Sequence, residues 1–235
     1  MTLTIHPLLG IPEVSSGDDL PRLLIASLDR AGLSLENRDV VVITHKIVSK
    51  AEGAVRLLDG SDEDTAYRKI VLDESVEVLR RRGDLVIART RHGFICANAG
   101  VDRSNAAAGT VVLLPQDPDQ SAHGIRMALE AASGASIAVI VTDTFGRAWR
   151  RGLVDIAIGL SGTAALLDLK GEVDASGREL AVTEIAVIDE IAAAADLVMG
   201  KADGIPAALL RGLAVSSGDG RATDLIRLPR EDLFR

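Results

Sequence analysis

A strand-length run of apolar residues that ends in polar side chains most constrains how this chain can fold. Residues 137–141 are all apolar, and residues 40–43 form a second run of this kind. Such runs are typical of strands that are buried on both faces of a sheet. Segments with one apolar helical face separate the strand-like runs. This alternation predicts an α/β fold in which helices cover mixed sheets.

Patterning and start signals predict the individual elements. We expect strands at 2–5, 39–44, 84–88, 110–114, 137–141, 166–169 and 213–215, and helices at 18–31, 61–82, 117–132 and 183–199. A capping box at residues 61–64 starts the second of these helices. The chain shows no internal repeat, low-complexity linker or sharp boundary, so we expect residues 1–235 to form one domain.

Composition narrows the class of protein. The net charge of −8 argues against a nucleic-acid binder, which usually carries a basic face. The single cysteine, Cys96, excludes an internal disulfide and indicates a reducing compartment. The N-terminus has no signal-peptide pattern, and four acidic residues interrupt the longest apolar region, 180–199. We therefore expect a cytoplasmic protein that does not span a membrane.

The first candidate site follows the run at 137–141. Asp143 stands there between two threonines, and Arg147, Arg150 and Arg151 come next. Ligands of open α/β sheets gather beyond the carboxyl ends of strands. A carboxylate beside a hydroxyl suits Mg²⁺ or Mn²⁺, and arginines suit phosphate or carboxylate groups. The alternative is that Asp143 merely caps a following helix.

Other polar segments carry similar alternatives. His45, Lys46 and Lys50 follow the strand at 39–44 and could meet phosphates, or the lysines could be solvated surface residues. Residues 89–105 are dense in functional groups, although Asp102 and Asn105 are also typical of Asx-turns. The glycines of residues 200–206 could form a helix cap and turn, or bring backbone amides close to a nucleotide.

Residues 92 and 96 also have two interpretations each. His92 could be a catalytic base, but a satisfied or orienting histidine is the commoner case. Cys96 lies among apolar residues and is expected to be a small buried hydrophobe rather than a nucleophile.

Several enzyme classes lose their main sequence support. The chain contains no P-loop, dinucleotide fingerprint, H-E-x-x-H motif, cysteine pair or G-x-S-x-G elbow. A P-loop ATPase, a Rossmann dehydrogenase, a zincin and a serine hydrolase are therefore disfavoured.

An ordered set of segments resembles the coenzyme F420-0:L-glutamate ligases, also called F420 γ-glutamyl ligases. The matching segments are 10–13 (Gly-Ile-Pro-Glu), 47–53 (Ile-Val-Ser-Lys-Ala-Glu-Gly), 89–93, 97–105, 142–147 with 149–150, 189–192 and 197–200. They occur in the family's order along almost the whole chain, and the ordered set is specific although no single segment is. The resemblance implies the family's own α/β fold, an intertwined homodimer, and a ligase that depends on GTP and a divalent metal.

The resemblance also implies roles for individual residues. Asp102 and Asp143 look like ligands of one Mg²⁺ or Mn²⁺, Thr144 looks like a contributor to a second, and K⁺ is a further candidate ion. The nucleotide contacts would be Gly10, Ile11, Pro12, Glu13, His45, Lys46, Lys50, Asn105, Gly200, Ala202 and Gly204. Lys201 departs from the pattern, because many members have a metal-binding residue there and an ammonium cannot ligate a cation.

The chemistry that the resemblance implies fits these residue types. An amide can be made from a carboxylate after GTP converts it to an acyl phosphate, a step that depends on positioning and charge neutralisation. Lys50 would assist this step, Arg147 and Arg150 would hold the acidic substrates coenzyme F420-0 and L-glutamate, and His92 is a weaker candidate base. Some actinobacterial relatives carry a nitroreductase-like FMN domain after a similar C-terminus, whereas this sequence stops at residue 235.

Two rival hypotheses remain: a metal-dependent phosphohydrolase or kinase, and a non-catalytic module that binds deazaflavin or nucleotide.

Overall fold

The computed structural model describes residues 2–60 and 62–233. At its centre lies a five-stranded sheet in the order β1-β12-β2-β8-β9. The strands are β1 (Thr4–Pro7), β2 (Val40–Thr44), β8 (Ala138–Arg147), β9 (Arg150–Ser161) and β12 (Ala207–Arg211). β2 and β8 run parallel, and the other neighbours run antiparallel. Both apolar runs lie in this pair of inner strands, where they are fully buried.

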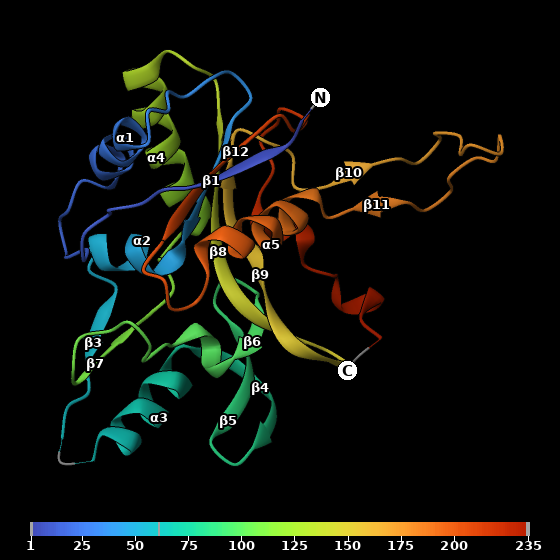
Figure 1. Ribbon diagram of the computed structural model, residues 1–235. Helices are drawn as coiled ribbons and strands as arrows, with labels where there is room; N and C mark the ends of the chain where they lie inside the picture. Colours follow the sequence, from blue (N-terminus) through green and yellow to red (C-terminus); the bar gives the residue numbers. More distant parts are fainter. Residues whose placement is uncertain (1, 61, 234–235) are drawn as a thin grey trace.

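Helices cover both faces of this sheet. They are α1 (Leu20–Arg30), α4 (Pro118–Ser133) and α5 (Val187–Met199). α1 and α4 lie on one side of the sheet and α5 lies on the other (Figure 1). α4 approaches β9 so closely that a Cβ atom at Gly159 would lie 2.4 Å from the carbonyl oxygen of Pro118. Glycine is therefore required at that position, because any side chain would push the helix away from the strand.

β8 and β9 form a hairpin that projects beyond the rest of the sheet (Figure 1). β2 ends at Thr44, which pairs with Thr142, so the later residues of β8 pair with β9 alone. The register of β8 against β9 shifts between Val141 and Thr142. The extra residue is Ile158 of β9, and such an irregularity bends and twists the hairpin locally. Asp143 and Thr144 come directly after the bulge, beyond the carboxyl end of β2.

A smaller lobe continues from this end of the sheet (Figure 1). It consists of β3 (Val55–Leu57), α3 (Glu63–Asp73), β4 (Ser75–Arg82), β5 (Leu85–Thr90), β6 (Ile95–Ala97), η1 (Asn98–Gly100) and β7 (Thr110–Val112). β4, β5 and β6 form a three-stranded sheet, and β3 pairs with β7. The buried apolar residues of this lobe form a core of their own.

A long arm leaves the body of the molecule between β9 and α5 (Figure 1). Its base is the pair β10 (Leu167–Asp168) and β11 (Glu184–Ile185). Two short 3-10 segments, η2 (Ala222–Leu225) and η3 (Pro229–Glu231), close the described chain. Within residues 2–60 and 62–233, no helix combines the length and the apolar character needed to cross a membrane.

Most predicted elements are present with shifted ends. The predictions at 2–5, 39–44, 84–88, 110–114, 166–169, 18–31 and 117–132 are confirmed in kind. The strand predicted at 137–141 is also present, but it does not end at Val141 and continues to Arg147. Asp143 therefore lies inside a strand, and the alternative that it caps a helix is wrong.

The helix predicted at 61–82 is wrong in its second half. α3 ends at Asp73, and β4 follows from Ser75. Val76 and Val78 alternate with polar residues, which favours a strand, and Gly83 makes the turn into β5 with a φ of 60°. Ser61, the first residue of the predicted capping box, lies outside the described residues, and Asp62 is the N-cap of α3.

Two further predictions are corrected by pairing partners that the sequence does not show. α5 begins at Val187 rather than 183, because residues 184–185 pair with 167–168. The last strand is β12 at 207–211 rather than 213–215, and it lies between β1 and β2. Alanine and leucine have high helix propensity, so this strand was not evident. The polar segment after β2 is a short helix, α2 (His45–Ala51).

Candidate functional site

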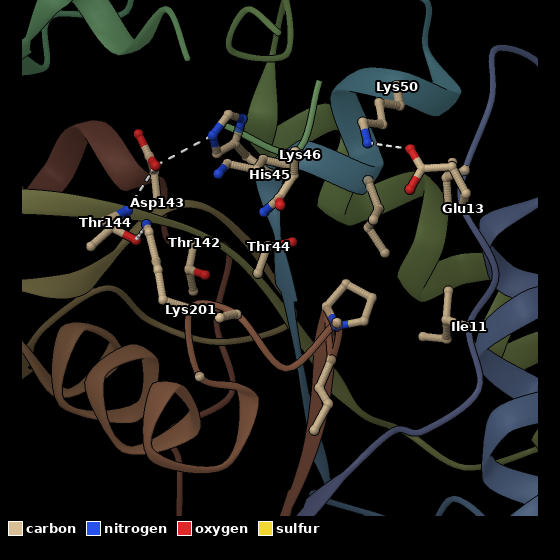
Figure 2. Close-up of a pocket in the computed structure, with 18 of the residues that line it drawn as sticks. Ile11, Glu13, Thr44, His45, Lys46, Lys50, Thr142, Asp143, Thr144 and Lys201 are labelled. Carbon is tan, nitrogen blue, oxygen red and sulfur yellow. Dashed lines mark hydrogen bonds and ion pairs between the residues drawn. The ribbon is translucent and has the colours of Figure 1, made fainter. Parts of the chain in front are cut away.

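A cavity of 620 Å³ opens at the carboxyl end of β2. α2, the hairpin β8–β9 and the loops 11–14, 105–107 and 200–206 surround it (Figure 2). Its lining includes nearly all of the predicted nucleotide contacts: Ile11, Pro12, Glu13, His45, Lys46, Lys50, Asn105, Gly200, Ala202 and Gly204. The fold therefore brings together residues from five separate parts of the chain.

The two lysines of α2 are not solvated surface residues. Lys50 is 8% exposed, and its Nζ atom lies 2.5 Å from Glu13 Oε1. Lys46 Nζ lies 2.7 Å from Asp102 Oδ2 and donates to Ser104 Oγ at 2.5 Å. Both ammonium groups are thus fixed beside the cavity by acceptors from distant segments. Lys50 is buried and Lys46 is half-buried, so water screens both charges less than those of surface lysines, which suits a polyanionic ligand.

Asp102 does not line the cavity itself but holds one of these lysines. Burial raises the pKa of its carboxyl. Hydrogen bonds from Lys46 and from the Ser104 backbone, together with the charge of Lys46, lower this pKa. The lowering is the larger effect, so the pKa of Asp102 lies below its ordinary value. Asp102 Oδ1 also accepts from the backbone N–H of Ser104, which is the Asx-turn that the sequence left open. The turn and the ion pair coexist, and together they keep Asp102 ionised.

Asp143 faces α2 from the hairpin (Figure 2). Its Oδ1 atom accepts from the backbone N–H of Thr144 at 2.7 Å and lies 3.3 Å from His45 Nε2. That ring nitrogen is buried and, although Asp143 lies within ion-pair distance, it has no hydrogen-bond partner among the described residues. His45 Nδ1 lies 3.3 Å from Ser49 Oγ. The cavity therefore contains a carboxylate with free acceptor capacity beside an unsatisfied ring nitrogen.

Thr144 points to the opposite face of the hairpin, toward Asp155. Its hydroxyl donates to Asp155 Oδ1 at 2.6 Å and accepts from Lys201 Nζ at 2.6 Å. Asp155 is 3% exposed and also accepts from Thr142 Oγ1 at 3.0 Å. The sequence analysis missed Asp155, although it is the one charged residue in the apolar stretch 152–160. Such an isolated charge in a strand was the available signal.

The carboxylates of the cavity fit a divalent cation only in part. Among residues 2–60 and 62–233, no group of three or more His, Cys, Asp or Glu side chains is arranged to hold a metal ion. Mg²⁺ commonly takes one or two protein carboxylates and completes its shell with water and substrate phosphates. Asp143 meets that requirement, and a shared site with Asp102 remains a prediction. Thr144 fits less well, because an ammonium already occupies its hydroxyl.

The remaining predicted residues lie outside the cavity. Gly10 adjoins the lining, and its carbonyl accepts from Arg30 Nη2 at 2.8 Å, which anchors the loop. Arg147 and Arg150 lie at the exposed end of the β8–β9 hairpin, where Arg147 Nη2 donates to the carbonyl of Arg151. Their role in holding acidic substrates stays a prediction.

Cys96 takes the simpler of its two interpretations, whereas His92 is satisfied at only one ring nitrogen, because its Nδ1 is buried without a hydrogen-bond partner among the described residues. His92 Nε2 lies 2.9 Å from the carbonyl oxygen of Pro115, so this nitrogen carries the proton. Burial, with the charge of Arg91, lowers the pKa of His92. Burial raises the pKa of Cys96 to about 12, which keeps it a neutral thiol. Neither side chain lines the cavity.

Similarity to known proteins identifies the family of this chain. Residues 9–212 match the family described as F420-0:Gamma-glutamyl ligase. The chain belongs to this family. It is 42% identical to the coenzyme F420:L-glutamate ligase of Methanothermobacter thermautotrophicus over the whole of both chains. It is 43% identical to the ligase of that name from Methanocaldococcus jannaschii, with 86% of each chain covered. The chain is therefore an enzyme that forms an amide bond.

Proposed function

We propose that this ligase joins L-glutamate to coenzyme F420-0 at the expense of GTP, and that it adds further glutamates through γ-linkages. The observation that carries the nucleotide part of the proposal is the cavity at the end of β2. Lys46, Lys50 and Lys201 bring three ammonium groups to one cavity beside the carboxylate of Asp143. A nucleoside triphosphate with a divalent cation is the substrate whose charges match this arrangement.

The reaction proceeds in two balanced steps. The terminal carboxylate oxygen of coenzyme F420-0 attacks the γ-phosphorus of GTP, and the bond from that phosphorus to the β–γ bridging oxygen breaks. This yields an acyl phosphate and GDP. The amino group of L-glutamate then attacks the acyl carbon, phosphate leaves, and the amine proton is released. The products are the amide, GDP and phosphate.

The side chains of the cavity divide this work. Lys46 and Lys50 hold phosphate oxygens, and their buried position prevents water from screening the attraction. Asp143, with Asp102 behind Lys46, would hold Mg²⁺ or Mn²⁺, which neutralises the phosphate charge that develops during transfer. The loops 11–14 and 200–206 line the cavity, and in this proposal they contact the guanosine.

A homodimer is part of the proposal. The arm around β10 and β11 extends away from the body and exposes apolar side chains, with Val173 66% and Val182 83% exposed. Exposed apolar residues on a projecting arm are typical of a surface that a second copy covers.

Mass spectrometry tests the function directly. The protein is incubated with coenzyme F420-0, L-glutamate, GTP and Mn²⁺, and in parallel without the metal or without GTP. A ladder of glutamyl-sized mass increments that requires both additions is the expected result. GDP release without any increment would instead favour a phosphohydrolase. Binding of deazaflavin or nucleotide without either product would favour the non-catalytic module.

A further inference from the structure

The hydroxyl of Thr144 lies between a carboxylate and an ammonium. It donates its single hydrogen to Asp155 Oδ1 and accepts from Lys201 Nζ, each at 2.6 Å (Figure 2 shows the lysine contact). A metal ion on this oxygen would lie within a few ångströms of a positive charge that cannot act as a ligand. The predicted second metal therefore does not fit the residues that are present.

Carboxylates balance the charge of Lys201. Asp155 is buried, and Asp196 lines the same cavity. Burial and the charge of Asp155 raise the pKa of Asp196, and the charge of Lys201 opposes this effect. Two carboxylates beside a polyanion site would repel the ligand, and the ammonium of Lys201, bound to the hydroxyl that donates to Asp155, supplies an opposing charge.

The backbone is shaped to place Lys201 there. Gly200 follows the last residue of α5 as its C-cap and has a φ of 61°, a backbone conformation that residues other than glycine rarely adopt. A Cβ atom at this residue would lie 2.2 Å from Asp203 Oδ2. The glycine thus turns the chain sharply out of the helix, and the next residue projects back toward the β8–β9 hairpin.

We propose that Lys201 is a built-in cation that takes the place of a second divalent metal, so that each protomer binds one divalent ion with its nucleotide. This inference rests on the proposed use of a nucleotide and a metal. It predicts that replacing Lys201 with a neutral oxygen ligand opens a second metal position formed by the new side chain, Thr144 and Asp155.

The experiment counts Mn²⁺ ions in the full-length protein saturated with GDP, by titration with electron paramagnetic resonance of the free ion. The wild type is expected to bind one Mn²⁺ per protomer and Lys201→Gln two. Lys69→Gln is the matched control, because Lys69 is exposed on α3 in the smaller lobe and does not line the cavity. It should bind one.

Two outcomes would overturn the inference and are distinguishable from failure of the proposed function. Two Mn²⁺ ions in the wild type would show that Lys201 replaces nothing. Equal numbers in the wild type and Lys201→Gln would show that the lysine does not control the site. Failure of the wild type to bind GDP and Mn²⁺ at all would refute the proposed function, and this inference with it.

A second cavity, of 800 Å³, lies between the β8–β9 hairpin, the β4–β5–β6 sheet and η2. Its walls are mostly apolar and include Phe94, Phe145 and the exposed Trp149. The rings of Phe94 and Phe145 lie edge to face, with 6.5 Å between their centroids. Aromatic walls of this kind bind flat ring systems by stacking and edge contacts.

The position and charge of this cavity specify its occupant further. Phe145 lies two residues after Asp143, on the same face of β8, about 7 Å along the strand. Arg80, Arg89 and Arg227 line the cavity with Asp189 and Asp232, so cations outnumber carboxylates in the lining, although Arg89 also pairs with Glu77. A ligand that fits has a flat aromatic ring system, an anionic group, and a tail long enough to reach Asp143.

We infer that this cavity holds the flat ring system of the acceptor, with an anionic group of the acceptor near the arginines and its carboxylate directed toward Asp143. This inference deepens the proposed function by locating its second substrate. The nucleotide and the acceptor would then approach the point of phosphoryl transfer from two cavities that meet at the β8–β9 hairpin.

Affinity for coenzyme F420-0, measured by the fluorescence of its ring, tests this inference without requiring turnover. Arg227→Glu and Trp149→Ala are expected to weaken binding of coenzyme F420-0 at least about tenfold, while GDP affinity stays unchanged. Arg230→Glu is the matched control, because Arg230 is exposed in the same segment and does not line the cavity. Unchanged affinity in both test variants would overturn the inference. A shift to monomer in sedimentation would also overturn it, because the cavity would then be a surface that a second copy covers.

Discussion

The two cavities share the β8–β9 hairpin, but the pKa of a lining or adjoining carboxyl shifts in opposite directions in the two. In the first, each buried cation has a carboxylate or hydroxyl partner from a distant segment, and the pKa of Asp102 lies below its ordinary value. In the second, burial raises the pKa of Asp189, and the backbone N–H of Ala157, which opposes this shift, does not outweigh it.

The difference shows that burial alone does not set the charge of a site. Asp102 and Asp189 are buried to a similar extent, but only Asp102 accepts a hydrogen bond from an ammonium. The ammonium reverses the effect of desolvation on the carboxyl pKa. The first cavity is therefore suited to charged phosphates, and the second is suited to an apolar ring.

Asp143→Asn should have the largest effect, because Asp143 is the uncompensated carboxylate of the first cavity. The amide oxygen can still accept from the Thr144 backbone, so the fold should be retained. Loss of metal-assisted charge neutralisation is expected to lower ligation about 10³-fold in mass-spectrometric rate assays. Asp73→Asn, at the exposed end of α3, should have wild-type activity. Full activity in Asp143→Asn would refute the proposed metal site at this carboxylate.

Lys50→Ala should follow, with a loss of about 10²-fold in kcat/KM for GTP. The variant removes one of the buried ammonium groups that distinguish the first cavity from the second. Lys50→Arg keeps the charge and should recover part of the activity. Steady-state kinetics with varied GTP separates this role from a role in acceptor binding, and an effect confined to the acceptor's KM would contradict the assignment.

Arg147→Ala and Arg150→Ala should have smaller effects, within about tenfold in kcat/KM, because exposed arginines interact weakly through water. Both lie on the hairpin outside the two cavities. A loss of 100-fold or more in either variant would instead support the sequence-based prediction that they hold acidic substrates. The molecule would then have a third binding region, for acidic substrates, at the end of the β8–β9 hairpin.

Asp189→Asn should have the smallest effect, on stability rather than on catalysis. The carboxyl has a raised pKa in the folded protein, so its ionisation destabilises the fold as the pH rises above the ordinary value of 3.8. Asparagine keeps the acceptor for the Ala157 N–H without the charge. Thermal unfolding should give a slightly higher Tm for the variant at pH 7, and the difference should vanish below pH 3.8. A lower Tm at pH 7 would show that the charge is compensated.

Local sequence patterns predicted much of the fold but not its long-range pairing. The apolar runs of β2 and β8 and the capped helices α1 and α4 were evident, because burial and capping leave marks in a few consecutive residues. β4 and β12 were not evident from the sequence. They are strands because of the strands they pair with, and not because of their own composition. The same limit applies to the site: Asp143 stood out beside its strand, whereas Asp155 did not.

The sequence by itself determined the family, the alternation of strands and helices, and the residue types of the candidate site. The tertiary structure decided which charges work together. It brought Lys46 to Asp102, Lys50 to Glu13 and Lys201 to Thr144, and it left Arg147 and Arg150 exposed. The physical reason is that the interaction energy of a charge depends on its distance from water and from its partners. Only the folded chain sets those distances.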